Sequence, residues 1–277
     1  MDHELNLKYD HLREILTEIG ETAVAFSGGV DSALLLHVAG TVCRRVFAVT
    51  AVSELFPSKE QEEAAAFCGE RGIRQYPVRP DVMAVPGFPE NPPDRCYLCK
   101  KALFTQMLAA AASEGCSVLC EGSNKDDLAD YRPGKKALKE LGIRSPLLEA
   151  GFTKRDIRAL AASLGLAVSE KPSYACLASR IPYGERITPE KLSMAERAEQ
   201  FLRDSGFGQL RVRVHGTLAR IEVEPHLISR FADSGFREAA AERFREIGFS
   251  YTAVDLTGYR TGSLNEVLPE ALTGGKS

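Results

Sequence analysis

The chain has 277 residues, of which 44% are hydrophobic, 26% charged and 8% aromatic. These proportions are ordinary for a globular protein and exclude a disordered, collagen-like or fibrous chain, and the length suggests one principal domain with a smaller one attached. Lys and Arg number 35 against 38 Asp and Glu, and this net charge of −3 weakens the case for a nucleic-acid substrate.

The N-terminus is charged from Asp2 onward, and no run of 18 apolar residues occurs in the chain. We therefore expect neither a secretory signal nor a membrane span. Seven cysteines in such a chain point to the reducing cytosol. There, spaced cysteines bind metal or take part in chemistry more often than they form disulfides.

The chain begins with a predicted amphipathic helix, because apolar residues between Leu5 and Ile19 recur at helical spacing. Strands and helices then alternate, apart from a stretch with six prolines between residues 77 and 93 that must be a loop. Such alternation predicts an α/β fold with a parallel sheet covered by helices on both faces. The predicted strands are 22–26, 45–50, 73–78 and 117–121, and the predicted helices are 33–38, 58–71, 100–113 and 152–164.

The pattern changes after a second proline-bracketed loop over residues 171–188. Beyond it we predict helices at 189–204 and 228–247, a hairpin around His215 and Gly216, and a strand at 251–256. We place a domain boundary near residue 184, which gives a principal α/β domain over 1–184 and a smaller α+β domain over 185–277.

The segment SGGVDS joins the first of these predicted strands to the helix that follows it. Its glycines permit close backbone approach to an anion, its serines add hydroxyl donors, and the helix N-terminus supplies unpaired N–H groups. Asp31 can cap the first turn or help to hold a magnesium ion. The segment matches neither a Walker loop nor a dinucleotide fingerprint. The predicted phosphate-binding residues are Ser27, Gly28, Gly29, Asp31 and Ser32.

SGGVDS after an apolar strand resembles the PP-loop of the adenine-nucleotide alpha-hydrolases. That resemblance implies that ATP is cleaved between its α- and β-phosphates and that a substrate oxygen is adenylated. EGSNKDD, over residues 121–127, resembles the second acidic-glycine element of such enzymes. It implies that Gly122 and Asp126 contact the nucleotide, and that Asp126 and Asp127 hold Mg²⁺ together with Asp31. The alternative for both segments is a turn that binds nothing.

Three of the cysteines stand out by their spacing or position. Cys96 and Cys99 form a C-x-x-C pair, but the sequence has neither a second such pair nor a histidine pair to complete a zinc site. Cys176 lies in a comparable non-regular segment, and three thiolates without a fourth suit an iron–sulfur cluster with one open iron. The alternatives are a redox dithiol and an ordinary loop cysteine. Cys43, Cys68, Cys116 and Cys120 lie in or beside apolar patterns and are interpreted as small buried hydrophobes.

Five segments occur in a fixed order: SGGVDS, NPPDRCYLCK, EGSNKDD, KPSYACLASRIPYGERIT and DLTGYRTGSLNE. Together they resemble the LarE-type sulfur transferases over essentially the whole chain. This resemblance implies a PP-loop ATP pyrophosphatase domain over 1–184 and a substrate and oligomerisation domain over 185–277. It further implies conversion of the carboxylates of pyridinium-3,5-biscarboxylic acid mononucleotide to thiocarboxylates, for the nickel-pincer cofactor of lactate racemase.

The family has two sources of sulfur. In one branch the cysteine that matches Cys176 attacks the acyl adenylate and gives up its own sulfur. In the other branch the cysteines that match Cys96, Cys99 and Cys176 hold a [4Fe-4S] cluster whose open iron carries sulfide. Because all three are present, the resemblance favours the cluster. It also implies a cytoplasmic homotrimer or homohexamer, with a nickel-inserting synthase acting downstream.

The acidic, phosphorylated substrate implied by the family would be bound largely by arginines, which suit bidentate contacts with phosphate and carboxylate. The alternative for the two arginines that alternate along one strand is a solvated strand face. Competing functions are a PP-loop tRNA thiolase, an amide-forming synthetase and a nucleotide sensor without chemistry. The implied substrate-binding residues are Ser179, Arg180, Arg211, Arg213 and Arg260.

Overall fold

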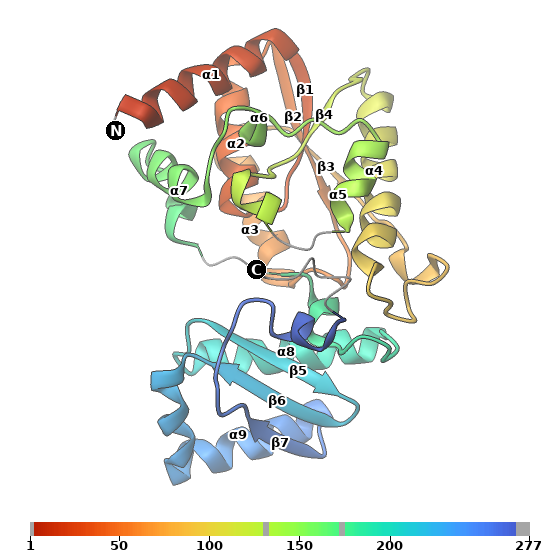
Figure 1. The fold of residues 1–277 in the computed structure, drawn as a ribbon, viewed down its shortest axis with the longest axis vertical. Coiled ribbons are helices and arrows are strands. Elements are labelled where there is room, and N and C mark those ends of the chain that lie inside the picture. Colours follow the sequence, from red (N-terminus) through yellow and green to blue (C-terminus); the bar gives the residue numbers. More distant parts are fainter. Residues whose placement is uncertain (1–2, 130–132, 172–174, 270–277) are drawn as a thin grey trace. The chain divides into compact units, whose positions relative to one another are not determined.

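The computed structural model describes residues 3–129, 133–171 and 175–269. The chain forms two compact units, and each contains two separate stretches of sequence. The first unit consists of residues 1–85 and 96–174, and the second of residues 86–95 and 175–277. In Figure 1 most of the first unit runs from red to green, and most of the second is cyan and blue.

A parallel four-stranded sheet forms the centre of the first unit, in the order β3-β2-β1-β4. From β1 the chain proceeds to β2 and β3 on one side, whereas β4 pairs with the other side of β1. In open α/β sheets, ligands bind at the carboxyl ends of the strands where the order reverses in this way. The strands are β1 Glu21–Ala25, β2 Arg45–Ala51, β3 Gln75–Val78 and β4 Leu119–Cys120.

Helices cover both faces of this sheet, as predicted for the α/β fold (Figure 1). Val24 faces a core shared with α1, α2 and α7, while its neighbour Ala23 faces a core shared with α4 and α5. Alternate residues of a strand point to opposite faces, so β1 is buried on both sides. The helices are α1 His3–Ile19, α2 Val30–Val42, α3 Ser58–Glu70, α4 Arg95–Ser113, α5 Gly134–Glu140, α6 Pro146–Glu149 and α7 Lys154–Ser163.

The second unit is built on a three-stranded sheet in the order β5-β6-β7. β5 (Leu210–His215) and β6 (Leu218–Val223) are antiparallel, and β7 (Tyr251–Val254) is parallel to β6. The predicted hairpin around His215 and Gly216 is thereby confirmed. Helices α8 (Pro189–Asp204) and α9 (Ser234–Ile247) complete this α+β unit.

Residues 86–95 belong to the second unit, and the units divide at residue 174 instead of the predicted 184. Asn91 shows why. Its side-chain amide donates to the backbone carbonyls of Ile181 at 3.1 Å and Pro182 at 2.7 Å. Its backbone carbonyl accepts from the N–H of Gly184 at 3.0 Å. Asn91 adopts this position with a φ of 57°, in the left-handed region that asparagine tolerates better than most residues. The proline-rich loop is therefore hydrogen-bonded to the segment that follows Cys176.

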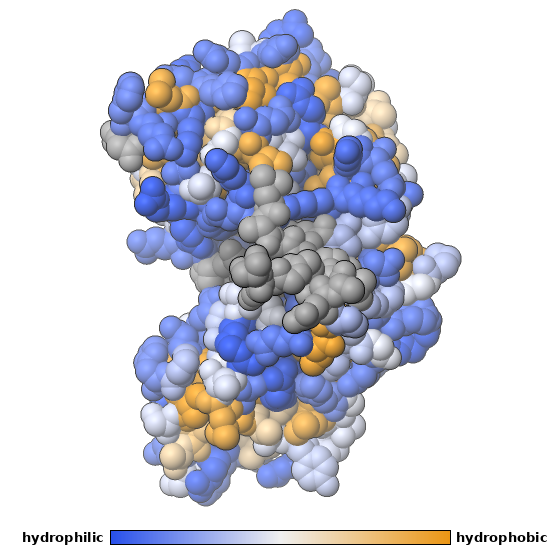
Figure 2. Space-filling model, viewed as in Figure 1, coloured by the Kyte–Doolittle hydropathy of each residue, from blue (hydrophilic) through white to orange (hydrophobic). Residues whose placement is uncertain are grey.

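Among the described residues, no helix combines the length and apolar character needed to cross a membrane. The face in Figure 2 is largely hydrophilic, with apolar side chains in small groups. Within the described ranges, the large hydrophobic side chains that are well exposed are Leu7, Tyr251, Leu256 and Val267.

Candidate functional site

The predicted phosphate loop leaves the carboxyl end of β1 and enters α2, at the point where the strand order reverses. Gly28 has a φ of +74°. A Cβ atom there would lie 3.2 Å from the Cβ of Ala64 and 3.3 Å from the carbonyl oxygen of Glu60, both on α3. Both the backbone conformation and the packing of α3 therefore require glycine at this position.

Two hydroxyl groups lie across this loop from each other. The Oγ atoms of Ser27 and Ser32 are 3.2 Å apart, and the hydroxyl of Ser32 also donates to the carbonyl of Gly29 at 3.1 Å. α2 begins directly after Gly29, so the N–H groups of its first turn have no partners within the helix. The loop thus combines hydroxyls, backbone N–H groups and a helix N-terminus, which is the combination that binds phosphate.

The acidic segment 121–127 follows β4 and packs against this loop, because β4 pairs directly with β1. Gly122 is the point of contact. A Cβ atom there would lie 2.9 Å from the backbone nitrogen of Ser32 and 3.1 Å from the Cβ of Asp31. The absence of a side chain at Gly122 therefore allows the segment to approach the first turn of α2.

Asp31 and Asp126 are brought together by one residue, Lys154. The Nζ of Lys154 lies 2.5 Å from Oδ2 of Asp31, and the backbone N–H of Lys154 donates to Oδ2 of Asp126 at 2.7 Å. Oδ1 of Asp31 is buried and has no hydrogen-bond partner among the described residues. Burial raises the pKa of Asp31, and the charge of Lys154 partly opposes this effect.

These carboxylates fit a magnesium ion that arrives with a nucleotide. Mg²⁺ in phosphate-transfer sites is commonly bound by one or two carboxylates plus phosphate oxygens, so it does not need a complete protein cage. Oδ1 of Asp31 is an oxygen of the required kind. Asp127 points back into its own segment, where one of its carboxylate oxygens accepts from the N–H of Asn124 at 2.9 Å. Across the described parts of the chain, no three or more His, Cys, Asp or Glu side chains form a group that could hold a metal ion by itself.

Cys96 and Cys99 lie in the first turns of α4, which begins five residues before the predicted start at residue 100. Residues three apart share a helix face, and here Cys96 is exposed and Cys99 partly exposed. The residue before the pair is Arg95, whose guanidinium donates to Oδ1 of Asn91 at 2.6 Å and stacks on the ring of Tyr183 at 4.2 Å. Neither cysteine is buried in the core.

Cys176 belongs to the second unit and is partly exposed. It precedes a 3-10 turn, Leu177–Arg180. The guanidinium of Arg180 donates to the carbonyls of Ala175 at 2.6 Å and Cys176 at 3.3 Å, so it fixes the backbone on either side of the thiol. Pro172, Ser173 and Tyr174 of the same predicted loop lie outside the described residues.

Arg180 is fully buried and forms an ion pair with Glu199 of α8, which is also fully buried. The two carboxylate oxygens of Glu199 accept from Arg180 at 2.7 and 2.9 Å. One of them also accepts from the N–H of Val212 at 3.1 Å, and the other from Arg203 at 2.7 Å. Burial disfavours the charge on Glu199, but the charge and hydrogen bonds of Arg180, together with the charges of Arg203 and Arg211, outweigh it and the pKa falls to about 2. Arg180 therefore acts within the fold as a support for the Cys176 segment.

Arg213 is similarly embedded in protein contacts. Its guanidinium donates to Glu222 at 2.6 Å, to the hydroxyl of Ser263 at 2.8 Å and to the carbonyl of Ser179 at 2.8 Å. Its Nε is buried without a hydrogen-bond partner among the described residues. The strand face that carries Arg213 is buried, so the alternative of a solvated face does not hold.

The other two predicted arginines differ from each other. Burial, together with the charge of Arg180, lowers the pKa of Arg211 to about 10, and its guanidinium lies 5.3 Å from the ring centre of Tyr259. Arg260 is more exposed and makes a bidentate pair with Glu266 at 3.0 and 3.1 Å. Substrate binding by these arginines and by Ser179 stays a prediction.

The sequence analysis did not identify Glu199, Glu222 or Lys154. The sequence did indicate that Glu199 is buried, because it lies on the same face of α8 as the apolar residues Leu192, Ala195 and Leu202. Glu222 alternates with apolar residues along β6 and therefore looks like a residue of an exposed strand face. Lys154 begins a helix of ordinary charged composition, and nothing in its local sequence distinguishes it.

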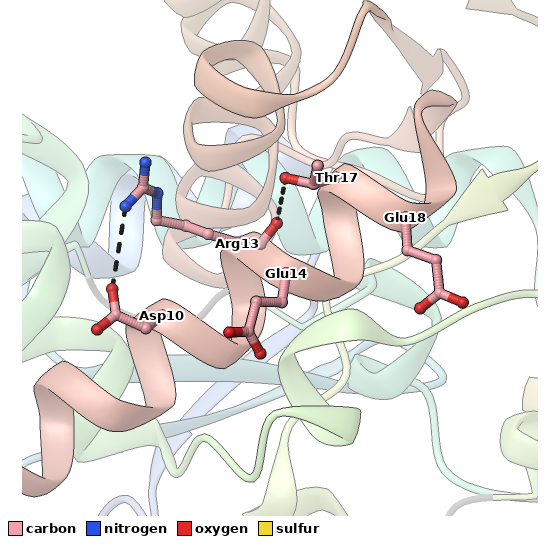
Figure 3. A pocket seen from close by; sticks show the side chains of 5 residues that line it. All are labelled: Asp10, Arg13, Glu14, Thr17 and Glu18. Carbon is pink, nitrogen blue, oxygen red and sulfur yellow. Dashed lines mark hydrogen bonds and ion pairs between the residues drawn. The ribbon is translucent and has the colours of Figure 1, made fainter.

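A shallow hollow also lies along the exposed side of α1 (Figure 3). Its polar contacts stay within the helix, such as the donation from the Thr17 hydroxyl to the carbonyl of Arg13 at 2.7 Å. The hollow contains none of the predicted site residues and is simply the surface of this helix. Its lining residues are Asp10, Arg13, Glu14, Thr17 and Glu18.

Comparison with known proteins relates the whole chain to a named enzyme. The chain is 38% identical over 258 residues to the pyridinium-3,5-bisthiocarboxylic acid mononucleotide synthase of Lactiplantibacillus plantarum, covering 92% of this chain and 93% of that protein. The chain belongs to the LarE-type family of enzymes. It is also 42% identical over 265 residues to an uncharacterized protein of Synechocystis sp., covering 95% of this chain and 99% of that protein.

The chain is also similar to a more distant protein. The identity is 31% over 243 residues to an uncharacterized protein of Methanocaldococcus jannaschii, covering 86% of this chain and 90% of that protein. No protein-family model matches the chain. The resemblance inferred from the five sequence segments is thus confirmed at the level of the family, together with the α/β fold.

Proposed function

We propose that this enzyme converts the carboxylates of pyridinium-3,5-biscarboxylic acid mononucleotide to thiocarboxylates, after activating each carboxylate with ATP. The relative from Lactiplantibacillus plantarum is named for the corresponding bisthiocarboxylic acid product. The observation that carries the ATP requirement is the loop at residues 27–32, which presents hydroxyls and N–H groups beside Asp31 at the reversal of strand order.

Activation must precede sulfur transfer, because an unactivated carboxylate oxygen is a poor leaving group. In the proposed first step, a carboxylate oxygen of the substrate attacks the α-phosphorus of ATP and displaces pyrophosphate. The hydroxyls of Ser27 and Ser32 and the first-turn N–H groups of α2 bind the departing pyrophosphate. A magnesium ion held through Asp31 and Asp126 would supply neutralising charge to the phosphates.

Sulfur then displaces AMP from the acyl adenylate. On the sacrificial route, the Cys176 thiolate forms a thioester and AMP leaves. Loss of the Cα proton and cleavage of the Cβ–S bond then release the thiocarboxylate and leave dehydroalanine at position 176. The attacking species in this step is the thiolate of Cys176, which is a far stronger nucleophile than the thiol.

We favour the second route, in which Cys96, Cys99 and Cys176 hold a [4Fe-4S] cluster. Such a cluster, when bound, supplies a sulfide nucleophile at the iron that lacks a cysteine ligand. The C-x-x-C spacing of Cys96 and Cys99 supports this assignment, as does the full or partial exposure of all three cysteine residues. Within that unit, Ser179, Arg180, Arg211, Arg213 and Arg260 are the proposed determinants of substrate binding, Arg180 through its support of the Cys176 segment.

Analysis of the nucleotide products tests the first step. Incubated with ATP, Mg²⁺ and the biscarboxylate substrate, the protein is expected to form AMP and pyrophosphate. Ser27→Ala and Asp31→Asn should each reduce turnover at least tenfold, whereas Asp10→Asn, on the exposed side of α1, should not. Formation of ADP and orthophosphate would contradict the assignment of the loop, and intact ATP would indicate a nucleotide sensor.

A further inference from the structure

The position of Lys154 suggests a role that the reaction scheme above does not include. We propose that Lys154 is a nucleotide-binding residue that exchanges partners. In the nucleotide-free protein its ammonium group neutralises Asp31, and when Mg-ATP binds it moves to a phosphate oxygen. This inference rests on the proposed use of ATP and adds to it the residue that balances the charge of the site.

The backbone of Lys154 and its ammonium group are held by different contacts. The backbone is fixed, because its N–H donates to Asp126 at 2.7 Å and because Thr153 and Asp156 form a capping box around the first turn of α7. The capping hydrogen bonds are 3.2 Å from the N–H of Asp156 to Thr153 and 3.0 Å from the N–H of Thr153 to Asp156. The ammonium group, by contrast, has its one described side-chain contact with Asp31, at 2.5 Å.

The side chain of Lys154 is therefore anchored at its base and able to move at its tip. It is 28% exposed, so the ammonium group is neither locked in the core nor free in solvent. A lysine has four rotatable carbons between its backbone and its charge, which allow the ammonium to change partners without movement of the helix.

The charges at the site give a reason for such an exchange. One carboxylate oxygen of Asp31, Oδ2, lies 2.5 Å from the Lys154 ammonium, and the other, Oδ1, is buried without a hydrogen-bond partner among the described residues. Lys154 thus supplies the positive charge beside this carboxylate. A magnesium ion that binds Asp31 takes over this role, and two cations at one carboxylate repel each other. The ammonium is then drawn to the phosphates that the metal brings, because they are the strongest anions at the loop.

The proposed exchange predicts that Lys154→Met changes the affinity for a metal ion and the affinity for a nucleotide in opposite directions. Without nucleotide, the metal no longer competes with an ammonium group for Asp31, so Mn²⁺ used as a probe should bind at least threefold more tightly. The Mg²⁺ complex of α,β-methylene-ATP, which cannot be cleaved at the relevant bond, should bind at least tenfold more weakly. Lys154→Arg keeps the charge and should restore most of the nucleotide affinity.

The measurements are electron paramagnetic resonance of free Mn²⁺ and isothermal titration calorimetry with the nucleotide analogue, both on the full chain. Lys191→Met is a matched control, since Lys191 is 22% exposed and pairs with Glu185 at 3.0 Å in the second unit. It should change neither affinity. A variant that failed to fold would lose both affinities, so the opposite signs separate the exchange from a structural defect.

Several outcomes would overturn the inference. Wild-type affinity of Lys154→Met for the analogue would show that the ammonium does not contact phosphate, and would leave the proposed use of ATP intact. Unchanged or weaker binding of Mn²⁺ would show that the ammonium does not compete with a metal for Asp31. If the wild-type protein bound no analogue at all, the proposed function would fail and this inference with it.

Discussion

Glu199 illustrates how a single buried charge is stabilised in this protein. Four donors surround its carboxylate: two nitrogens of Arg180, one of Arg203 and the backbone N–H of Val212. Because the side chains of Glu199 and Arg180 are both fully buried, neither can turn to water if the other is removed. Breaking a buried pair of this kind is costly, whereas loss of an exposed pair costs little.

We predict that Glu199→Gln destabilises the protein by about 3–5 kcal/mol, because Arg180 is left as an uncompensated buried charge. Urea titration followed by circular dichroism would measure the change. Arg186→Gln is the control, since Arg186 and Glu90 form a pair that is 65% and 57% exposed. Its removal should cost about 0–1 kcal/mol. Equal effects of the two substitutions would show that the buried pair is not stabilising.

The same carboxylate should make stability depend on acid pH. Folding lowers the pKa of Glu199 from 4.5 to about 2, so its charge stabilises the folded state fully above about pH 4.5. That stabilisation, about 3 kcal/mol, is lost as the pH falls from 4.5 towards 2. The difference in unfolding free energy between the wild type and Glu199→Gln should therefore shrink over this range. A difference that stayed constant would contradict the depressed pKa.

At the scale of elements, the phosphate loop depends on the fit between β4, α2 and the segment after β4. We predict that Gly122→Ala weakens binding of α,β-methylene-ATP at least tenfold, because its Cβ would lie 2.9 Å from the backbone nitrogen of Ser32. Such overpacking should also cost about 1–3 kcal/mol of stability.

Gly69→Ala is the matched control for this substitution. Gly69 lies within α3, and an added Cβ there would meet no atom within 4 Å. Alanine should stabilise the helix by about 0.5–1 kcal/mol and leave nucleotide affinity unchanged. If Gly122→Ala bound the analogue as well as Gly69→Ala does, the close approach of the two segments would not matter for the site.

The elements nearest this loop could be predicted because their local signals agree. The apolar run TAVAF followed by two glycines and a helix specifies a buried strand and a tight turn, and the structure has β1 and α2 at these places. The start of α4 was predicted late, because two prolines precede it and the signal for the helix became clear only at residue 100. α5 and α6 were not predicted, being short helices whose position depends on packing against the sheet.

The parts of the site that could not be predicted are contacts between distant segments. Lys154 lies 123 positions from Asp31 in the sequence, and its role follows only from the folded geometry. Arg180 and Arg213 were identified as cations, but their burial and their carboxylate partners depend on how α8 and the second sheet pack. A sequence pattern shows which residues carry charge, whereas the topology determines which charges meet.

At the scale of the whole molecule, the path of the chain determines which unit contains each of the three cysteines. It leaves the first unit after residue 85, returns to it at residue 96 and leaves again after residue 174. Cys96 is the first residue after one of these crossings, and Cys176 is the second residue after another. The three cysteines are therefore distributed over both units, with Cys99 one helical turn beyond Cys96. Both proposed routes therefore use residues of both units, since the phosphate loop belongs to the first unit and Cys176 to the second.

The number of cysteines that each route requires gives the sharpest test of how sulfur reaches the substrate. If the three cysteines hold a cluster, anaerobically purified wild-type protein should contain iron and acid-labile sulfide, and each of the three Cys→Ser variants should lose activity. Cys176 should keep its mass after turnover, and added sulfide should support many turnovers.

If Cys176 is instead sacrificed, intact-protein mass should fall by about 34 Da after one turnover, the mass of hydrogen sulfide, and Cys96→Ser should remain active. Cys68→Ser, which alters a buried thiol of α3, is the control for both. An active Cys176→Ala variant would contradict both routes.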